Sequence, residues 1–257
     1  MSSALKFARA QTHLADLQSQ VRAFLAAIAD DLAEPATAQD GSIEYRRRDL
    51  PPPPVEIALT FGDFLQTARA SLDHAVYAIS TAVRPGFGMT GFPIVLSPEA
   101  FEEAKRKYLP FVPEETLEAI RGLQPFVSGI GDRDFLWQLH DLARTDRHRT
   151  ITLLTAVVEA ESVGWTRTEP SDEYPDIHLY RPAVAAGELL VRLPSPEQEP
   201  SARFTPDFQA RVVIGEGDRS TERPDVIGLA TEIRGRVWLA RNAIDPAAGS
   251  ASQGQSN

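Results

Sequence analysis

The stretch FGDFLQTARASLDHAVYAIS, residues Phe61–Ser80, decides which fold this chain can adopt. Its apolar residues recur at spacings of three and four, the period of an α-helix with one face turned to a core. That face consists of Phe61, Leu65, Ala68, Leu72, Val76 and Ile79. The opposite face, from Asp63 to Tyr77, contains no Lys or Glu, so we expect it to be covered as well. A helix covered on both sides lies at the centre of a helical bundle.

Three polar residues of this helix are candidates for chemistry. Arg69 and Asp73 are four residues apart, so they can form an ion pair on one side of the helix. The simplest interpretation is that the pair satisfies an arginine at the edge of the core and that His74 is a hydrogen-bonded interior histidine. The alternative is a catalytic role, in which Arg69 holds a phosphate and His74 takes a proton. Histidine is suited to that role because its side chain ordinarily titrates near neutral pH.

Further helices are predicted in the first half of the chain by apolar periodicity and by capping residues. The clearest start is Ser97 followed by Pro98, because serine caps a helix and proline suits its first turn. Gly122 marks a helix end. The predicted helices are residues 4–33, 98–108, 113–121 and 132–147.

One charged residue continues the apolar face of the helix at 132–147. That face is formed by Leu136, Leu139 and Ala143. Asp146 follows in the same line, and a buried unpaired charge is very costly, so we expect Arg69 and His74 to be its partners. Arg147 and His148 lie beside it, where cations also complement the negative end of the helix dipole. Asp73, Asp146, Arg147 and His148 are therefore the predicted supporting polar network.

The second half of the chain predicts strands. Segments rich in Val, Ile, Thr and Leu are separated by clusters of Gly, Pro and Ser, and their short spacing favours antiparallel pairing. They are residues 151–163, 177–180, 188–193 and 204–214, with an earlier extended piece at 42–48 and a returning helix at 225–244. We predict an α+β fold: a helical bundle followed by an antiparallel β-sheet and a C-terminal helix. The regions are a bundle at 1–149, a β-rich part with its closing helix at 150–246 and a disordered tail at 247–257, together forming one integrated domain.

Composition excludes several classes of function. The formal net charge of −10 argues against broad electrostatic binding to nucleic acid, although basic runs occur at 46–48 and 144–149. No cysteine is present, which excludes disulfides, thiolate metal sites and a cysteine nucleophile. No apolar run reaches the ~20 residues of a membrane span, and no signal peptide is evident. The expected protein is soluble and cytoplasmic, with no membrane partner.

Several short motifs together resemble a group of bacterial proteins that have no assigned activity. The motifs are Gly62-Asp63-Phe64-Leu65, Arg69-Ala-Ser-Leu-Asp-His74, Phe92-Pro93-Ile94, Gln124-Pro125-Phe126 and Asp146-Arg147-His148-Arg149. The spacing of Arg69 and His74 also resembles the R-x4-H signature of HEPN domains, the helical-bundle ribonucleases of toxin and antiviral systems. That resemblance implies metal-independent RNA cleavage at a site assembled across a homodimer. Ala70 departs from it, because many members have a polar residue after the arginine.

Three functional hypotheses stay open. The first and preferred one is a non-enzymatic binding or structural protein with a buried Arg/His/Asp network and an unknown partner. The second is the HEPN-like endoribonuclease, with Arg69 and His74 as catalytic residues and RNA as the substrate. The third is a metal site in the bundle, built from His74, Asp73, Asp146, His148 and His140. No cofactor is predicted, and the sequence leaves open whether the protein is an enzyme.

Overall fold

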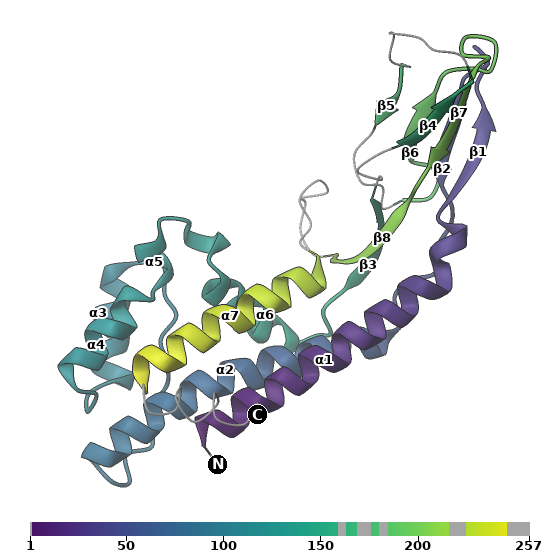
Figure 1. The fold of residues 1–257 in the computed structure, drawn as a ribbon. Coiled ribbons are helices and arrows are strands. Elements are labelled where there is room, and N and C mark those ends of the chain that lie inside the picture. The colour runs from purple at the N-terminus through teal and green to yellow at the C-terminus, as the bar shows by residue number, and fades with distance from the viewer. Residues whose placement is uncertain (1, 159–162, 169–175, 180–184, 216–224, 246–257) are drawn as a thin grey trace. The chain divides into compact units, whose positions relative to one another are not determined.

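The computed structural model describes residues 2–158, 163–168, 176–179, 185–215 and 225–245 (Figure 1). Its helices are α1 (Ser3–Ile28), α2 (Val55–Val83), α3 (Pro98–Tyr108), α4 (Glu114–Gly122), α5 (Pro125–Ser128), α6 (Phe135–Asp146) and α7 (Val226–Ile244). Short 3-10 turns occupy Ala29–Asp31 and Gly131–Arg133. The predicted α+β class, with helices first, an antiparallel sheet next and a closing helix last, is confirmed.

All pairing between the described strands is antiparallel, as predicted. The strands are β1 (Ala33–Thr37), β2 (Ile43–Arg47), β3 (Leu153–Val158), β4 (Val163–Arg167), β5 (His178–Leu179), β6 (Leu189–Leu193), β7 (Ala202–Pro206) and β8 (Gln209–Ile214). One sheet has the order β1-β2-β6-β5, while β3 pairs with β8 and β4 pairs with β7. The predicted strand at 204–214 is therefore two strands, and each pairs with a different neighbour.

The chain divides into two compact units. The helical unit contains Met1–Gln18, Glu56–Ile151 and Val226–Asn257, and the β unit contains Ser19–Val55 and Thr152–Asp225. These units are not the same as the two regions predicted from the sequence, which were divided at residue 149. β1 and β2 belong with the later strands because β2 pairs with β6, and α7 belongs with the helices because it packs against α4 and α6. The predicted disordered tail lies outside the described residues.

α2 supplies much of the core of the helical unit. Five of its predicted core residues, Phe61, Leu65, Ala68, Leu72 and Val76, are at most 1% exposed. The buried face is broader than the predicted stripe, because it also includes Phe64, Ser71 and Ala75. The opposite face is less covered than predicted, since Asp63 and Tyr77 are exposed. α6 contributes Leu136, Leu139 and Ala143 to this core, as its periodicity predicts.

The first turn of α1 is tied to two other helices of the helical unit. The Ser3 hydroxyl donates to the Ser71 carbonyl of α2 at 2.9 Å and accepts from Arg241 Nε of α7 at 2.8 Å. The guanidinium of Arg241 also lies over the Phe7 ring, 4.7 Å from its centroid. These contacts satisfy a buried arginine and fix where α1 begins.

The β unit has a hydrophobic core of its own. Ile28, Leu32, Leu50 and Leu190 form a buried cluster, against which Phe24, Leu25, Ala33, Phe208 and Ala210 pack. The first helix was predicted to continue to residue 33, but α1 ends at Ile28 and Ala33 begins β1. Leu32 lies beyond the end of α1, but it is buried in this cluster, as the apolar pattern of the sequence indicates.

Among the helices of the described ranges, none combines the length and the hydropathy that crossing a membrane requires.

Candidate functional site

Arg69 and Asp73 hold the backbone of one residue, Phe92. Arg69 Nη2 donates to the Phe92 carbonyl at 2.6 Å, and the Phe92 N–H donates to Asp73 Oδ1 at 2.9 Å. Arg69 Nη1 lies 3.2 Å from the same Asp73 oxygen, close enough for an ion pair although not aligned as a hydrogen bond. The Phe92 side chain is completely buried. One turn of α2 therefore clamps both polar groups of Phe92 while its ring fills the core.

Burial of the Arg69 guanidinium carries an electrostatic cost. Burial lowers the pKa of the guanidinium, Asp73 opposes that shift, and the positive charge of Arg147 reinforces it. Desolvation of a cation is tolerated when the charge is paired and hydrogen-bonded. Asp73 and the Phe92 carbonyl provide this compensation, so the predicted ion pair between Arg69 and Asp73 is present and has a structural partner.

The next residues of the same extended segment are held by Gln124. Its amide nitrogen donates to the carbonyls of Pro93 and Ile120, each at 3.0 Å, and its amide oxygen accepts from the Val95 N–H at 3.1 Å. Gln124 is fully buried, so each of these hydrogen bonds replaces one to water. The segment that contains Phe92, Pro93 and Val95 is thus anchored by side chains from two different parts of the helical unit.

Asp146 packs into a notch made by a glycine. A Cβ atom on Gly62 would lie 2.7 Å from the Asp146 Cγ, closer than such atoms normally approach. Asp146 Oδ2 accepts from Gln66 Nε2 at 3.1 Å, and the same nitrogen donates to the Ala143 carbonyl at 2.7 Å. Asp146 was predicted to pair with Arg69 and His74. That prediction is wrong, because its hydrogen-bond partner in the structure is the neutral amide of Gln66.

The structure gives a physical reason for all five motifs quoted from the sequence. The G-D-x-L motif contributes Gly62, which leaves room for Asp146 of the D-x-H-R motif. The arginine and the aspartate of the R-x-S-L-D-H motif clamp Phe92 of the F-P-I motif. The fifth, Q-P-F, supplies Gln124, which binds the next residues of that segment. The motifs occur together because the extended segment that contains Phe92 and the C-terminal end of α6 both pack onto α2.

His74 lies outside this network. Residues five positions apart on a helix point in directions about 140° apart, so Arg69 and His74 leave α2 on different sides. His74 is half-buried and lines a cavity of 440 Å³. The other lining residues are Ser2, Ser3, Ala4, Tyr77, Ala78, Thr81 and Asp245. Within the described residues, no hydrogen bond or ion pair involves His74, which differs from the expected hydrogen-bonded interior histidine.

Arg147 and His148 are exposed at the end of α6. Arg147 Nε donates weakly, at 3.4 Å, to the Ala143 carbonyl one turn earlier in the helix. In the part of the chain that the structure describes, no group of three or more His, Asp or Glu side chains is arranged to hold a metal ion. The ligand set predicted for a metal site, His74, Asp73, Asp146, His148 and His140, is therefore not brought together.

His140 is the histidine that the structure places in the electrostatic environment of Arg69. Its ring packs against Trp137, with centroids 5.4 Å apart, and its Nδ1 atom is buried without a hydrogen-bond partner among the described residues. Burial lowers the pKa of His140, and the positive charges of Arg69 and Arg144 lower it further. The sequence had placed His140 only among the possible ligands of a metal site, because the approach of α2 is a tertiary feature.

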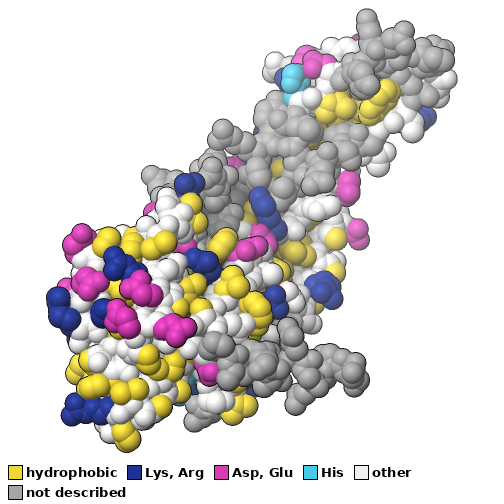
Figure 2. All heavy atoms as spheres, turned by 60° about the vertical axis from the view of Figure 1, so that its left-hand side comes forward, with side chains coloured by type: hydrophobic (Ala, Val, Ile, Leu, Met, Phe, Trp, Pro, Cys, Tyr) yellow, Lys and Arg dark blue, Asp and Glu magenta, His cyan; other side chains and the backbone are white. Residues whose placement is uncertain are grey.

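The first basic run of the sequence does not form an open basic surface, whereas the basic residues of the second run, Arg144, Arg147, His148 and Arg149, are exposed. Arg47 is 5% exposed and donates to the carbonyls of Arg48 and Thr155. Arg46 pairs with Glu44 at 2.6 Å, and Arg48 pairs with Asp31 at 3.1 Å. In the second run, Arg144 pairs with Asp141 at 2.9 Å. On the face of the molecule in Figure 2, acidic and basic side chains are interspersed.

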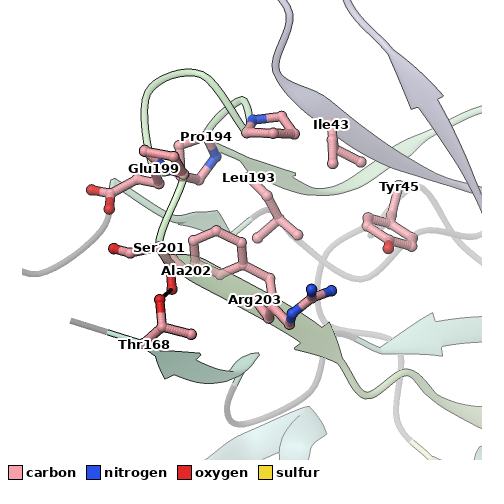
Figure 3. Close-up of a pocket in the computed structure, with 12 residues that line it drawn as sticks. Ile43, Tyr45, Thr168, Leu193, Pro194, Glu199, Ser201, Ala202 and Arg203 are labelled. Carbon is pink, nitrogen blue, oxygen red and sulfur yellow. Dashed lines mark hydrogen bonds between the residues drawn. The ribbon is translucent and has the colours of Figure 1, made fainter.

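The β unit contains an open cavity of 590 Å³ that sequence reasoning missed (Figure 3). Its lining residues are Ile43, Tyr45, Thr168, Leu193, Pro194, Pro196, Glu199, Pro200, Ser201, Ala202, Arg203 and Phe204. They come from β2, from the end of β6, from β7 and from the residues that join β6 to β7, with Thr168 following β4. The Thr168 hydroxyl donates to the Ser201 carbonyl at 3.4 Å across one side of it. The only sequence signal was the concentration of prolines at 194–200.

Comparisons with models of known protein families, with curated proteins and with solved structures found no match to this chain.

Proposed function

We propose that this chain is a non-enzymatic binding protein, in which the helical unit is held together by Arg69 and Asp73 and the cavity of the β unit receives the ligand. The observation that supports this most directly is the double hydrogen bond to Phe92. Both charged side chains are engaged with the backbone of their own protein. A partly buried network of this kind fixes how helices and loops pack.

The geometry also bears on the ribonuclease alternative. RNA cleavage of the HEPN kind needs a cation that can reach a phosphate and a base that can reach the neighbouring hydroxyl. The Arg69 side chain is 16% exposed and donates to Phe92, whereas His74 lines a separate cavity on the other side of α2. The endoribonuclease with Arg69 and His74 therefore stays the second candidate. It requires the RNA to contact two different sides of α2 at the same time.

One experiment separates the two functions. Wild type, Arg69→Ala and His74→Ala are assayed for cleavage of a mixed RNA substrate with a chelator present, and their unfolding in urea is measured in parallel. We expect no cleavage by any of them. Arg69→Ala should lose about 2–3 kcal/mol of stability, because it leaves the Phe92 carbonyl without its donor and removes the ion pair of Asp73. His74→Ala should lose less than about 1 kcal/mol, because it breaks no hydrogen bond.

The matched control is Arg144→Ala, which removes an exposed arginine paired only with Asp141 on the same helix. Its stability should change by no more than about 0.5 kcal/mol. Cleavage by wild type, lost in a folded and equally stable His74→Ala protein, would reverse the order of the two candidates. A stable Arg69→Ala protein would show that the clamp on Phe92 does not support the fold.

A further inference from the structure

Four consecutive prolines, Pro51–Pro54, lie between β2 and α2 and belong to the β unit. They have no assigned secondary structure, and none of the peptide bonds in the described part of the chain is cis. A proline ring fixes φ at about −65°, and a residue that precedes a proline is restricted to extended values of ψ. Both restrictions act on Pro51, Pro52 and Pro53, so this segment is a polyproline II helix.

Burial along this segment repeats every three residues, which is the period of a polyproline II helix. Leu50 is buried and Pro53 is half-buried, whereas Pro51, Pro52 and Pro54 are exposed. Leu50 packs in the buried cluster of the β unit that was described above. One edge of the polyproline II helix therefore faces its own protein, and the other two edges face solvent.

The two exposed edges carry apolar side chains only. Pro51 and Pro54 lie on one edge, because three residues complete a turn. Pro52 lies on the other edge and is followed three residues later by Val55, the first residue of α2, which is 56% exposed. We call these four exposed residues the proline ridge. None of them lines the cavity of the β unit, so the ridge is a separate surface.

The backbone of the proline ridge offers hydrogen-bond acceptors without donors, because proline has no N–H group. The Pro51 carbonyl accepts from the Thr155 hydroxyl at 3.2 Å. Within the described residues, the carbonyls of Pro52 and Pro53 receive no hydrogen bond from the protein. A complementary partner must supply flat apolar surface together with N–H or O–H donors, and Trp and Tyr side chains supply both.

The proline ridge is held in its conformation before any partner binds. Leu50 fixes one end in the core of the β unit, Thr155 holds the Pro51 carbonyl, and α2 begins directly after Pro54. A segment that already has its bound conformation loses little conformational entropy on binding. A rigid spacer would need the stiffness of the prolines, but it would not need two exposed apolar edges with open carbonyls.

We propose that the proline ridge is a docking site for a protein domain whose groove is lined by Trp and Tyr side chains. The aromatic rings pack against the exposed prolines and Val55, and their N–H and O–H groups donate to the carbonyls of Pro52 and Pro53. A groove covers only the side of the helix that enters it, so the contact of Leu50 with the β unit is compatible with docking. The inference goes beyond the proposed function, because it concerns a surface outside the cavity.

The test uses the full-length protein and a set of purified SH3 and WW domains, which bind polyproline II segments in aromatic grooves. Dissociation constants are measured by isothermal titration calorimetry. We expect at least one domain to bind more tightly than about 1 mM. A proline-rich peptide that fills the groove of that domain should displace the protein.

Variants of each exposed edge locate the contact. Val55→Glu and Pro51→Glu should each weaken binding by about tenfold or more, because a carboxylate would be desolvated against aromatic rings. Glutamate suits the first turn of a helix, and Pro51 is exposed, so both variants should fold. The matched control is Val83→Glu at the other end of α2, where the valine is 58% exposed. It should leave the dissociation constant unchanged, and urea unfolding checks that all three variants fold.

Three outcomes would overturn the inference. The first is that no domain binds at about 1 mM. The second is binding that Val83→Glu weakens as much as Val55→Glu does, or that neither ridge variant weakens. The third is a dimer of this chain in sedimentation that Val55→Glu dissociates, because the ridge would then be covered by a second copy. The RNA cleavage assay tests the proposed function separately, on residues of the helical unit.

Discussion

Gly62 shows at the residue scale how one missing side chain positions another residue. Alanine is normally the better helix former by about 1 kcal/mol, so a glycine inside α2 has a local cost. That cost is offset here because Asp146 occupies the space where a Cβ atom would lie. Asp146 in turn receives the hydrogen bond from Gln66, whose amide also binds the end of α6.

Replacing Gly62 by alanine should therefore change the stability of the protein in the direction opposite to that expected from helix propensity. Gly62→Ala is expected to destabilise the protein by about 1–3 kcal/mol, because the new methyl group overlaps the Asp146 carboxylate. The matched control is Gly235→Ala in α7, where no atom lies within 4 Å of the added Cβ, and which should stabilise by about 0.5–1 kcal/mol. Urea unfolding measures both. Equal effects of the two substitutions would show that Asp146 moves away at no cost.

His140 should make the stability of the helical unit depend on pH. Burial and the charges of Arg69 and Arg144 place its pKa in the folded protein below the ordinary value of 6.5. The unfolded chain then binds a proton that the folded chain does not, so stability is fully present above 6.5 and is lost as the pH falls through the lower pKa of the folded state. Protonation would add a third positive charge beside Arg69 and Arg144.

The measurement compares wild type with His140→Gln in urea unfolding at several values between about pH 8 and about pH 5. The wild type should lose stability more steeply on acidification, so the difference between the two proteins should change in favour of the variant as the pH falls. A difference that stays constant over the range would show that His140 does not titrate against folding.

At the scale of elements, the segment from Phe92 to Val95 is ordered by side chains and not by strand pairing. Its backbone has no assigned secondary structure, yet Phe92 and Ile94 are buried. Buried backbone groups require partners, and Asp73, Arg69 and Gln124 supply them. The two anchors act on different residues, which makes their contributions separable.

Amide hydrogen exchange should resolve the two anchors. Asp73→Ala is expected to accelerate exchange at the Phe92 N–H much more than at the Val95 N–H, because it removes only the acceptor of the first. Gln124→Ala should do the reverse, since it removes the acceptor of Val95. Each variant serves as the control for the other. Equal acceleration at both amides in either variant would indicate that the segment opens as one unit.

The early strand β1 shows why some elements escape a sequence analysis. The segment Ala33–Thr37 contains Pro35, a residue that is rare inside strands. β1 lies at the edge of its sheet and pairs with β2 alone, so a missing N–H at Pro35 is tolerated. Buried and exposed residues do not alternate along β1 as they do in a typical strand, because only one of its five residues is partly buried.

At the scale of the whole molecule, the two compact units are each assembled from separate parts of the chain. The β unit joins Ser19–Val55 to Thr152–Asp225, and the helical unit joins three segments. The pairing of β2 with β6 brings together residues that are far apart in sequence, and so does the contact of α7 with α6. The cavity of the β unit depends on the first of these arrangements, because Tyr45 of β2 and Leu193 of β6 both line it.

The sequence by itself determined the class of fold, most helices and the core faces of α2 and α6. These follow from local periodicity and capping, which neighbouring residues encode. It also singled out Arg69, Asp73, Asp146 and Gln124 as parts of motifs, and it predicted the ion pair between Arg69 and Asp73, but the partners that it predicted for Asp146 were wrong. Only the tertiary structure decided that Arg69 and Asp73 hold Phe92, that His140 and not His74 shares the environment of Arg69, and that the β unit contains a cavity. Those features join residues from different segments, and local periodicity contains no information about which segments meet.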